Sequence, residues 1–382
     1  KFKKYFMIKI GVTGQNGFIG THIYNSIPLF PVKYKRIDFE KSFFEDKTLM
    51  DEFVAKCDVI IHLAAMNRHK DPEVIYETNI GLVNSLVNSL KSTNSKAHVL
   101  FSSSTQEDAD NSYGRSKTEG RLIFEKWSNN SAGNFTGLIV PNVFGPFGLP
   151  YYNSVVATFC HELSNGLTPK INNDSILNLI HVDDLVNIIF REIDNFTKSK
   201  KTSNKLNIKA TDSISVSELL SLLNNFKSEY LESGIIPFFS SKLHLNLFNT
   251  FRSFINLENH FPVKYTKHSD TRGEFVEIIR LKTGGQVSFS TTVPGITRGN
   301  HFHTRKIERF SVIKGKALIQ LRKIGTNKII NLYLDGENTA YVDMPIWYTH
   351  NIKNIGEDIL YTNFWINEHY NQEDTDTFFE EV

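Results

Sequence analysis

The sequence predicts two domains of different class: an α/β domain with a doubly wound parallel sheet over residues 1–262, and an all-β domain over residues 263–382. Three observations support this division. An apolar stretch at residues 7–13 leads into a glycine-rich turn and then an apolar helix pattern. Later stretches continue to alternate between buried-strand and helix patterns. After residue 265 the pattern changes to short β-rich runs separated by Gly, Asn and Asp, which are typical of an antiparallel sandwich or barrel.

The composition is that of a globular protein without a dedicated nucleic-acid or membrane surface, since 40% of residues are hydrophobic, 22% are charged and the net charge is +2. Cys57 and Cys160 are the only cysteines, which excludes a disulfide framework and a cysteine-based zinc site. No apolar run approaches the ~20 residues of a membrane span, and the first apolar stretch is too short for a signal peptide. We therefore expect a cytoplasmic protein.

The first candidate site is the glycine-rich turn, which reads Thr-Gly-Gln-Asn-Gly-Phe-Ile-Gly over residues 13–20. A dinucleotide needs backbone N–H groups close to its pyrophosphate, and glycines at the start of a helix allow that approach. The alternative is a tight strand-to-helix turn without a ligand. Because strand, turn and helix stand in the required order, we expect a cofactor here. The expected contacts are Gly14, Gln15, Asn16, Gly17, Phe18, Ile19 and Gly20.

The next predicted strand, residues 32–38, leaves the choice between NAD and NADP open. Asp38 stands where a carboxylate accepts a hydrogen bond from the adenosine ribose, which favours NAD. Lys35 and Arg36 stand beside it and favour NADP, because either cation can bind a 2′-phosphate.

A third predicted strand, within residues 57–65, ends in Leu63, Ala64 and Ala65. This small-residue end lets a dinucleotide lie against the backbone, so we expect these three residues to contact the cofactor. His62 precedes them, and we expect it to be packed or hydrogen-bonded rather than catalytic.

Catalytic chemistry is expected at Tyr113 and Lys117, which are four residues apart and therefore lie on one face of a helix. An ammonium group stabilises phenolate, so we expect Lys117 to lower the pKa of Tyr113. A phenol with such a pKa serves as a general acid or base for an alcohol and carbonyl pair. Serines at positions 102–104 end another predicted strand, and one of these hydroxyls is expected to hold a substrate carbonyl.

In their order along the chain, these motifs resemble the extended short-chain dehydrogenase/reductase family, in its nucleotide-sugar branch. The resemblance covers roughly residues 7–250 and implies a Rossmann-type fold. Further matching motifs are Asn79, Pro141-Asn-Val-Phe-Gly-Pro146 and His181-Val-Asp-Asp184.

The resemblance implies roles for individual residues. Ser104 or Ser103 and Tyr113 would bind the carbonyl, and Lys117 would bind the nicotinamide ribose. Asn79 would belong to the cofactor site, and Asn142 and Asn153 to the sugar-nucleotide site. Two departures from the family pattern are a short segment between the serines and Tyr113, and apolar residues around Ile139 where an arginine is common.

In the second domain, His301 and His303 alternate by two, so both imidazoles point to one face of a strand. Glu308 can return to that face from the neighbouring strand, and His350 supplies a third imidazole from far along the chain. Three nitrogens and one carboxylate oxygen suit Zn, Mn, Fe or Ni, so the ligand types do not select the metal. The alternative is a polar surface pattern without a metal.

This spacing resembles the cupin family, whose fold is a jelly-roll barrel. The first cupin motif matches at every position from Gly295 to Gly315, whereas Trp347 stands where the second motif usually has glycine. Residues 270–277 and 298–301 also resemble the sugar 3,5-epimerase branch of cupins, in which the histidine matching His301 is the base. His301 thus has two competing roles, metal ligand and proton acceptor. Arg298 is a candidate for holding an enolate oxygen.

A reductase fused to a cupin resembles the bifunctional CapF/WbjC family of capsule and O-antigen enzymes over the whole chain. The family implies a UDP-linked 4-keto-6-deoxy-N-acetylhexosamine substrate, C3 epimerisation in the cupin, and reduction of the C4 ketone with NADP(H). It also implies one Zn²⁺ per cupin and a homodimer. The alternatives are a reductase with a purely structural cupin, an enzyme acting on a different 4-keto sugar, and a non-catalytic cofactor-sensing regulator.

Overall fold

The computed structural model describes residues 7–196 and 203–382, which form two compact units. The first unit extends to residue 155 and includes residues 174–216, and the second contains residues 156–173 and 217–382. The chain therefore passes between the units at residues 155–156, 173–174 and 216–217. The expected boundary at residue 262 falls inside the second unit, and as a boundary between sequence modules it stays a prediction. No described helix has the length and apolarity needed to cross a bilayer.

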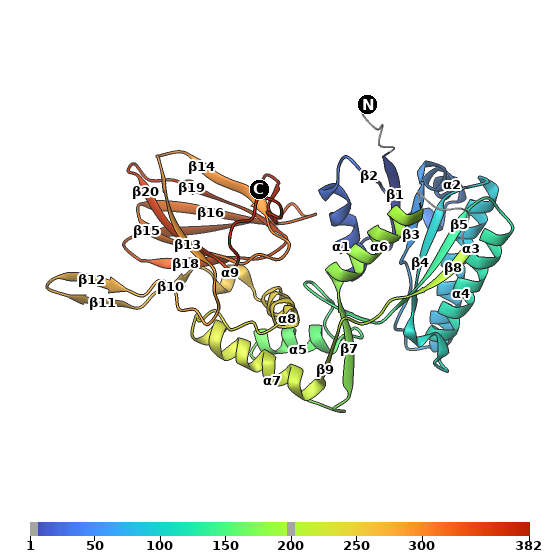
Figure 1. The fold of residues 1–382 in the computed structure, drawn as a ribbon, viewed down its shortest axis with the longest axis horizontal. Helices are drawn as coiled ribbons and strands as arrows, with labels where there is room; N and C mark the ends of the chain where they lie inside the picture. The colour runs from blue at the N-terminus through green and yellow to red at the C-terminus, as the bar shows by residue number, and fades with distance from the viewer. Residues whose placement is uncertain (1–6, 197–202) are drawn as a thin grey trace. The chain divides into compact units, whose positions relative to one another are not determined.

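The first unit contains a six-stranded parallel sheet in the order β2-β1-β3-β4-β5-β8 (Figure 1). Strand β1 lies inside the sheet with β2 and β3 on either side, which is the arrangement that a doubly wound fold requires. The strands are β1 (Ile8–Thr13), β2 (Tyr34–Ile37), β3 (Val59–His62), β4 (His98–Ser104), β5 (Asn134–Val140) and β8 (Ser203–Asn207).

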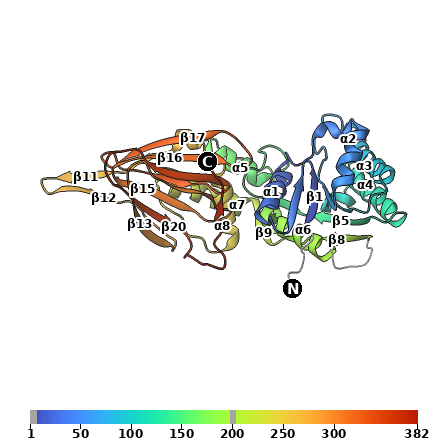
Figure 2. The ribbon, with the colours of Figure 1, turned by 90° about the horizontal axis from the view of Figure 1, so that it is seen from above.

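Helices cover both faces of this sheet, as Figure 2 shows from above. Side chains of β3 alternate between the faces, because Ile61 packs in the cluster with α1 and α6, and Ile60 packs in the cluster with α2, α3 and α4. This alternation explains why the strands read as continuous apolar runs. The helices are α1 (Phe18–Ser26), α2 (Lys47–Lys56), α3 (Pro72–Ser92), α4 (Ser112–Asn129) and α6 (Val182–Phe196).

A small three-stranded sheet, in the order β6-β7-β9, completes the first unit. Its first strand follows β5 directly, so it brings Asn142 to the carboxyl end of the main sheet. The strands are β6 (Asn142–Phe144), β7 (Ile176–His181) and β9 (Asp212–Ser215).

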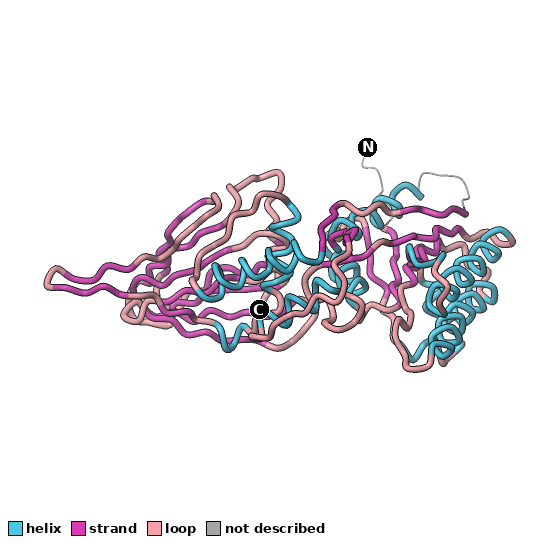
Figure 3. The backbone as a smooth tube through the Cα atoms, turned by 90° about the horizontal axis from the view of Figure 1, so that it is seen from below, coloured by secondary structure: helices cyan, strands magenta, loops and turns pink. Residues whose placement is uncertain are grey.

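The second unit is built around two five-stranded sheets that face each other, in the orders β10-β18-β15-β20-β13 and β17-β16-β19-β14-β21. Val342 of one sheet and Ile319 of the other belong to the same buried cluster, so the core lies between the sheets. Figure 3 shows the dominance of strands and loops in this barrel. The hairpin β11–β12 projects from it (Figure 1). The strands are β10 (Val263–Lys264), β11 (Lys267–Asp270), β12 (Gly273–Val276), β13 (Gln286–Thr292), β14 (Thr297–Phe302), β15 (Glu308–Lys314), β16 (Lys316–Lys323), β17 (Ile329–Asp335), β18 (Ala340–Met344), β19 (Tyr348–Asn354), β20 (Leu360–Ile366) and β21 (Phe378–Phe379).

A buried polar cluster joins the helical part of the second unit to the barrel. Arg309 and Asp343 form a bidentate ion pair at 2.7 and 2.9 Å, and Tyr230 donates a hydrogen bond to Asp343 at 2.8 Å. Arg252 donates to the carbonyl of Met344 at 2.9 Å. Because these groups are buried, the helices depend on the barrel for their polar partners. The helices are α5 (Val155–Ser164), α7 (Val216–Phe226), a π-helical turn (Lys227–Glu232), α8 (Lys242–Arg252) and α9 (Leu257–His260).

Candidate functional site

The glycine-rich turn has the geometry that a bound diphosphate requires. Gly14 has φ +78°, which favours glycine, and a Cβ there would lie 2.8 Å from the backbone nitrogen of Ala64. A Cβ on Gly20 would lie 2.1 Å from the carbonyl oxygen of Gly14. The backbone is therefore packed too closely for side chains, and it opens at the N-terminus of α1. These residues fit a dinucleotide.

A cavity of about 400 Å³ lies at the carboxyl ends of the strands, next to this turn. It brings together the glycine turn, the β4 serines, Tyr113 and the segment after β5. The expected site residues in its lining are Gly14, Gly17, Phe18, Ile19, Gly20, Leu63, Ala65, Ser103, Ser104, Tyr113, Lys117, Asn142 and Asn153.

Five of the expected cofactor residues lie outside this lining, namely Gln15, Asn16, Asp38, Ala64 and Asn79. Gln15 donates to the carbonyl of Phe39, and Asn16 is exposed. Ala64 contributes its backbone to the packing of Gly14. The amide oxygen of Asn79 accepts a hydrogen bond from the Met66 nitrogen at 2.6 Å, and its amide nitrogen donates to the Met66 carbonyl at 3.1 Å and to the Ser116 hydroxyl at 3.0 Å. Its geometry therefore fits the support of the loop after β3 better than cofactor contact.

Asp38 is also outside the cavity lining, and its side chain is 85% exposed. Its carboxylate accepts a hydrogen bond from Tyr24 at 2.9 Å and lies 3.9 Å from Arg36. The Arg36 guanidinium lies over the Tyr24 ring at 3.9 Å. A cation and an anion thus stand side by side after β2, and the choice between NADP and NAD stays open.

Tyr113 and Lys117 lie on α4 and line the same cavity, as their spacing predicts. The Lys117 Nζ lies 5.5 Å from the Tyr113 ring centroid and donates to the Ser102 carbonyl at 2.8 Å. Burial lowers the pKa of Lys117 to about 8. The expected lowering of the phenol's pKa is wrong here, since burial and the nearby Tyr152 raise the pKa of Tyr113 to about 12. The phenol is therefore protonated at neutral pH and can serve as an acid.

The two candidate serines have different local partners. Ser103 is buried and donates to Glu107, a carboxylate that also binds Arg121 at 2.8 Å. Ser104 accepts a hydrogen bond from the Gln106 nitrogen at 3.1 Å at the start of a 3₁₀ turn. Ser104 keeps its own hydroxyl proton for another acceptor, so it is better placed to donate to a substrate carbonyl.

One side of the cavity is formed by a segment that sequence reasoning identified only in part. Asn142 and Asn153 line it as expected, but Tyr152 lines it too. The backbone at Asn153 has φ +60°, and its side chain accepts a hydrogen bond from Arg68 at 2.6 Å. No sequence signal identified Arg68, because its partner lies 85 residues along the chain.

His301, His303, Glu308 and His350 converge in the barrel, and their ligand atoms all lie within 4.8 Å of one another. Nε2 of His303 and Nε2 of His350 each lie 3.2 Å from the same oxygen of Glu308. His301 lies near the end of β14, His303 comes directly after this strand, and Glu308 begins β15, so the chain returns the carboxylate to the two imidazoles.

The Nε2 lone pairs of His303 and His350 face the carboxylate of Glu308. Nδ1 of His303 meets the carbonyl of Asp376 at 2.5 Å, and Nδ1 of His350 meets the carbonyl of Tyr348 at 3.2 Å. A ring nitrogen facing a carbonyl carries the proton, so both Nε2 lone pairs face the carboxylate of Glu308. A proton or a cation must lie among these groups to remove the repulsion, so the four residues fit a divalent transition metal.

The protonation of the cluster reflects its burial. Burial and the neighbouring imidazoles lower the pKa of His301 to about 4. Burial opposes a charge on His303, but its interaction with Glu308 raises its pKa. Although burial favours a neutral carboxyl, the adjacent His303 and His350 hold the pKa of Glu308 far below its usual range, because a proton shared among these groups favours the carboxylate. His301 is thus neutral at pH 7, as a general base must be before it accepts a proton.

Arg298 lies on β14 with His301, but its guanidinium is committed to the end of β13. It donates to the Thr292 hydroxyl and to the Thr291 carbonyl, both at 3.1 Å. Its role in holding an enolate oxygen stays a prediction.

Two family models match the chain. Residues 10–208 match the NAD dependent epimerase/dehydratase family, and residues 268–378 match the polysaccharide biosynthesis C-terminal domain. The chain is 34% identical over 378 residues to the UDP-2-acetamido-2,6-beta-L-arabino-hexul-4-ose reductase of Pseudomonas aeruginosa, which covers 97% of this chain and 98% of that protein. The spore coat polysaccharide biosynthesis protein SpsL of Bacillus subtilis is 30% identical over 123 residues, which cover 30% of this chain and 82% of SpsL.

Comparison with solved structures also finds a relative that matches nearly the whole chain. The capsular polysaccharide assembling protein CapF of Staphylococcus aureus is 29% identical, with a TM-score of 0.59 over 98% of this chain and 100% of that one. WbmF of Bordetella bronchiseptica, solved with NAD⁺, has a TM-score of 0.54 at 16% identity over 66% of this chain and 93% of its own, a likeness of fold alone. The predicted fold class, a Rossmann-type parallel sheet followed by an antiparallel cupin-like barrel, is confirmed.

Proposed function

Because the chain belongs to the NAD-dependent epimerase/dehydratase family, in the branch of the Pseudomonas aeruginosa reductase, we propose that it reduces the C4 ketone of a UDP-linked 4-keto-6-deoxy-N-acetylhexosamine. The product would serve capsular or O-antigen polysaccharide synthesis. The observation that carries this proposal is the cavity that combines the glycine turn with Tyr113 and Lys117. A cofactor site and a proton donor for a carbonyl share one space.

In the finer form of the proposal, the cupin half first epimerises C3 of UDP-2-acetamido-2,6-dideoxy-L-arabino-hexos-4-ulose. The first unit then reduces the C4 ketone with NADPH, giving UDP-2-acetamido-2,6-dideoxy-L-talose on the pathway to UDP-N-acetyl-L-fucosamine.

In the reduction, a nicotinamide cofactor, when bound at the glycine turn, would supply the hydride for C4. Tyr113 donates its hydroxyl proton to the carbonyl oxygen, which becomes the alcohol. Its raised pKa keeps that proton in place until negative charge develops on the oxygen. Ser104 would hold the carbonyl beside the phenol, and Lys117, which donates to the Ser102 carbonyl at the cavity wall, would hold the ribose hydroxyls of the cofactor.

In the epimerisation, the C4 ketone acidifies the C3–H bond, so a base removes the proton and an acid returns it on the opposite face. His301 is the proposed base, since its lowered pKa keeps its ring neutral at pH 7. A divalent cation held by His303, Glu308 and His350 would stabilise negative charge on the enolate oxygen as a Lewis acid, and His301 would be its fourth ligand when it does not act as the base. His301 cannot serve as base and ligand through the same nitrogen, so the two roles are separable by experiment.

The test uses the 4-keto sugar in heavy water with NADPH, and the product is read by NMR. Tyr113→Phe should lose NADPH oxidation and retain deuterium entry at C3, whereas His301→Ala should lose deuterium entry. Tyr76→Phe is a matched control, since this phenol lies on α3 and pairs with Glu119 outside the cavity. Reduction retained by Tyr113→Phe would end its assignment as proton donor.

Two other functions give different outcomes in this experiment. If the cupin is purely structural, removal of metal will leave deuterium exchange unchanged. If the chain is a cofactor sensor without catalysis, no keto sugar will consume NADPH. The presence of Tyr113 and Lys117 in one cavity favours catalysis.

We further propose NADPH as the preferred cofactor, Zn²⁺ as the metal, and a cytoplasmic homodimer as the working form. Arg36, which lies beside Asp38 and over Tyr24, supports NADPH because a guanidinium can bind a 2′-phosphate. Comparison of kcat/KM with NADPH and NADH, metal analysis of the purified protein, and light scattering test these three points.

A further inference from the structure

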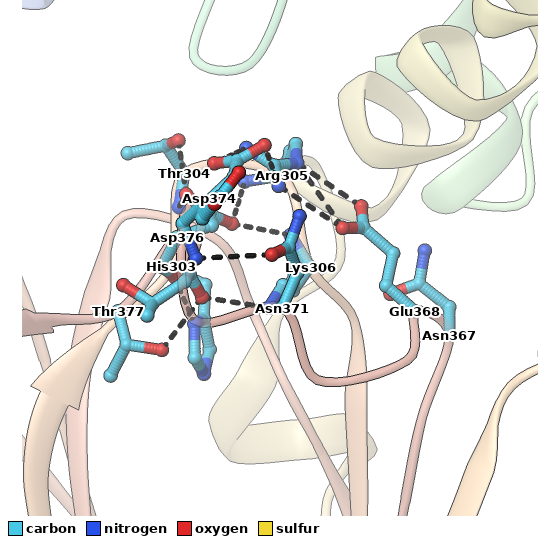
Figure 4. A network of polar contacts seen from close by, with 12 residues as sticks. His303, Thr304, Arg305, Lys306, Asn367, Glu368, Asn371, Asp374, Asp376 and Thr377 are labelled. Carbon is cyan, nitrogen blue, oxygen red and sulfur yellow. Dashed lines mark hydrogen bonds and ion pairs between the residues drawn. The ribbon is translucent and has the colours of Figure 1, made fainter.

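We propose that the segment of residues 374–380, here called the C-terminal clasp, positions the ligands of the candidate metal centre, with Asp376 as its principal positioning residue. The inference rests on the metal site proposed above and adds residues outside the ligand set. Its basis is a set of hydrogen bonds between the clasp and the segments that carry the three histidines; Figure 4 shows the part of it around His303 and the loop that follows.

The Asp376 carboxylate holds the loop that follows His303. One oxygen accepts from the Thr304 nitrogen at 3.1 Å and from the Thr304 hydroxyl at 2.6 Å. The other oxygen accepts from the nitrogens of Arg305 and Lys306, both at 3.0 Å. A carboxylate that is only 4% exposed thus satisfies three consecutive backbone N–H groups, which fixes the path of this loop.

The backbone of Asp376 contacts a ligand directly. Its carbonyl oxygen accepts from Nδ1 of His303, which places the proton on Nδ1 and turns the Nε2 lone pair towards Glu308. Asp376 has φ +41°, a conformation that Asp and Asn adopt more readily than most residues. The carboxylate and the carbonyl of one residue therefore fix the position and the tautomer of one ligand.

The rest of the clasp reaches the other two histidines. Strand β21 pairs with β14, so that Phe379 stands opposite His301. The Glu380 nitrogen donates to the Asn300 carbonyl at 3.0 Å, and the Glu380 carbonyl accepts from the hydroxyl of Thr349, the neighbour of His350. All three histidine-bearing segments thus contact the clasp.

The first residue of the clasp, Asp374, belongs to a group of ion pairs around Arg305 that lies nearer to solvent. Arg305 bonds to Asp374 at 2.9 Å and to Glu368 at 3.1 Å. The Asp374 side chain is 62% exposed, so this pair is expected to contribute little. Asp374 therefore offers a matched control for Asp376, because both acids lie in the clasp but only Asp376 is buried against a ligand.

The experiment measures Zn²⁺ affinity of the full-length protein after removal of metal with a chelator. Zn²⁺ is titrated in competition with a chromophoric chelator, and Co²⁺ is bound separately for its visible spectrum, which reports coordination geometry. The variants are Asp376→Asn, which keeps size and backbone preference, and Asp374→Asn. Loss of such outer partners costs roughly 10–100-fold in metal affinity, so we expect that weakening and an altered Co²⁺ spectrum for Asp376→Asn. Asp374→Asn should change the affinity by less than about twofold.

Folding of each variant is checked by circular dichroism and by NADPH binding. Zn²⁺ affinity equal to that of the wild type in folded Asp376→Asn overturns the proposal. If that variant does not fold, Thr304→Val decides, since it removes one donor to the carboxylate: weaker Zn²⁺ binding supports the clasp, and unchanged binding overturns it. If the wild type binds Zn²⁺ no more tightly than His350→Ala, the proposed metal centre is wrong and the clasp proposal is overturned with it; this comparison does not involve any clasp variant, so the two failures are distinguishable.

Discussion

Replacement of Lys117 by Met is expected to stabilise the first unit while abolishing reduction. The Lys117 side chain is 3% exposed, and its ammonium group has no carboxylate partner among the ion pairs of the described residues. Its described contacts are the Ser102 carbonyl and the faces of the Phe101 and Tyr113 rings. A buried cation without a countercharge destabilises the folded state.

The magnitude follows from the lowered pKa. Burial lowers the pKa of Lys117 from 10.5 to about 8, and one pKa unit corresponds to about 1.4 kcal/mol, so the charged form costs about 3 kcal/mol at pH 7. Replacement by Met removes this cost, but it also removes the hydrogen bond to the Ser102 carbonyl, which lowers the free energy of unfolding by about 1 kcal/mol. Met fills a similar volume without a charge, so Lys117→Met should raise the free energy of unfolding by about 2 kcal/mol at pH 7.

The pH dependence has a definite sign. Between pH 8 and pH 10.5 the unfolded chain binds a proton at this lysine that the folded chain does not, so wild-type stability rises with pH in that window. Below pH 8 the full destabilisation is present. The advantage of Lys117→Met should therefore be constant below pH 8, shrink above pH 8, and become a deficit of about 1 kcal/mol above pH 10.5, where only the lost hydrogen bond to Ser102 remains.

The assay is urea unfolding at several pH values, followed by the fluorescence of Trp127 in a background where Trp347 and Trp365 are replaced by Phe. Trp127 is then the single reporter and lies in α4 of the first unit. The difference between the two proteins cancels the titration of all other groups. A difference that does not change with pH, or a less stable Lys117→Met at pH 7, would refute the reasoning.

Two further predictions concern the glycine turn and the buried ion pair. Gly20→Ala should weaken NADPH binding more than about tenfold in a fluorescence titration, because its Cβ would collide with Gly14; Gly81→Ala, whose Cβ meets no atom within 4 Å, should bind NADPH normally. Asp343→Asn should lower the free energy of unfolding by about 3–5 kcal/mol, because it leaves a buried charge on Arg309, whereas the double replacement Arg309→Met with Asp343→Leu should cost less. A single variant as stable as the double one would contradict the second prediction.

The parts of the fold and of the candidate sites that depend on residues close together in the sequence could be predicted. The glycine turn and the pair Tyr113 and Lys117 are set by local spacing, and the structure places them together because parallel strands end at one edge. His301 and His303 converge because strand residues alternate faces.

Features that depend on burial or on distant contacts were not predictable. The direction of the Tyr113 pKa follows from burial in the finished fold and not from its neighbour four residues on. Asp376 lies 73 residues from the histidine that it holds, and no local pattern marks it. The amide of Asn79 bonds to Met66, in the loop after β3, and to Ser116 of α4, and only the tertiary structure brings these partners together.

The path of the chain between the two units limits how they can be separated. Because it crosses at residues 155–156, 173–174 and 216–217, no single proteolytic nick or gene truncation releases either unit intact. A fragment starting at residue 263 would lack Tyr230, so the buried pair of Arg309 and Asp343 would lose one of its hydrogen-bond partners and its cover from solvent. To exchange one whole unit with that of a relative, the two sequences must be joined at all three of these points. Recombination at a single point would combine segments of both proteins within one hydrophobic core, and we expect such hybrids to pack poorly.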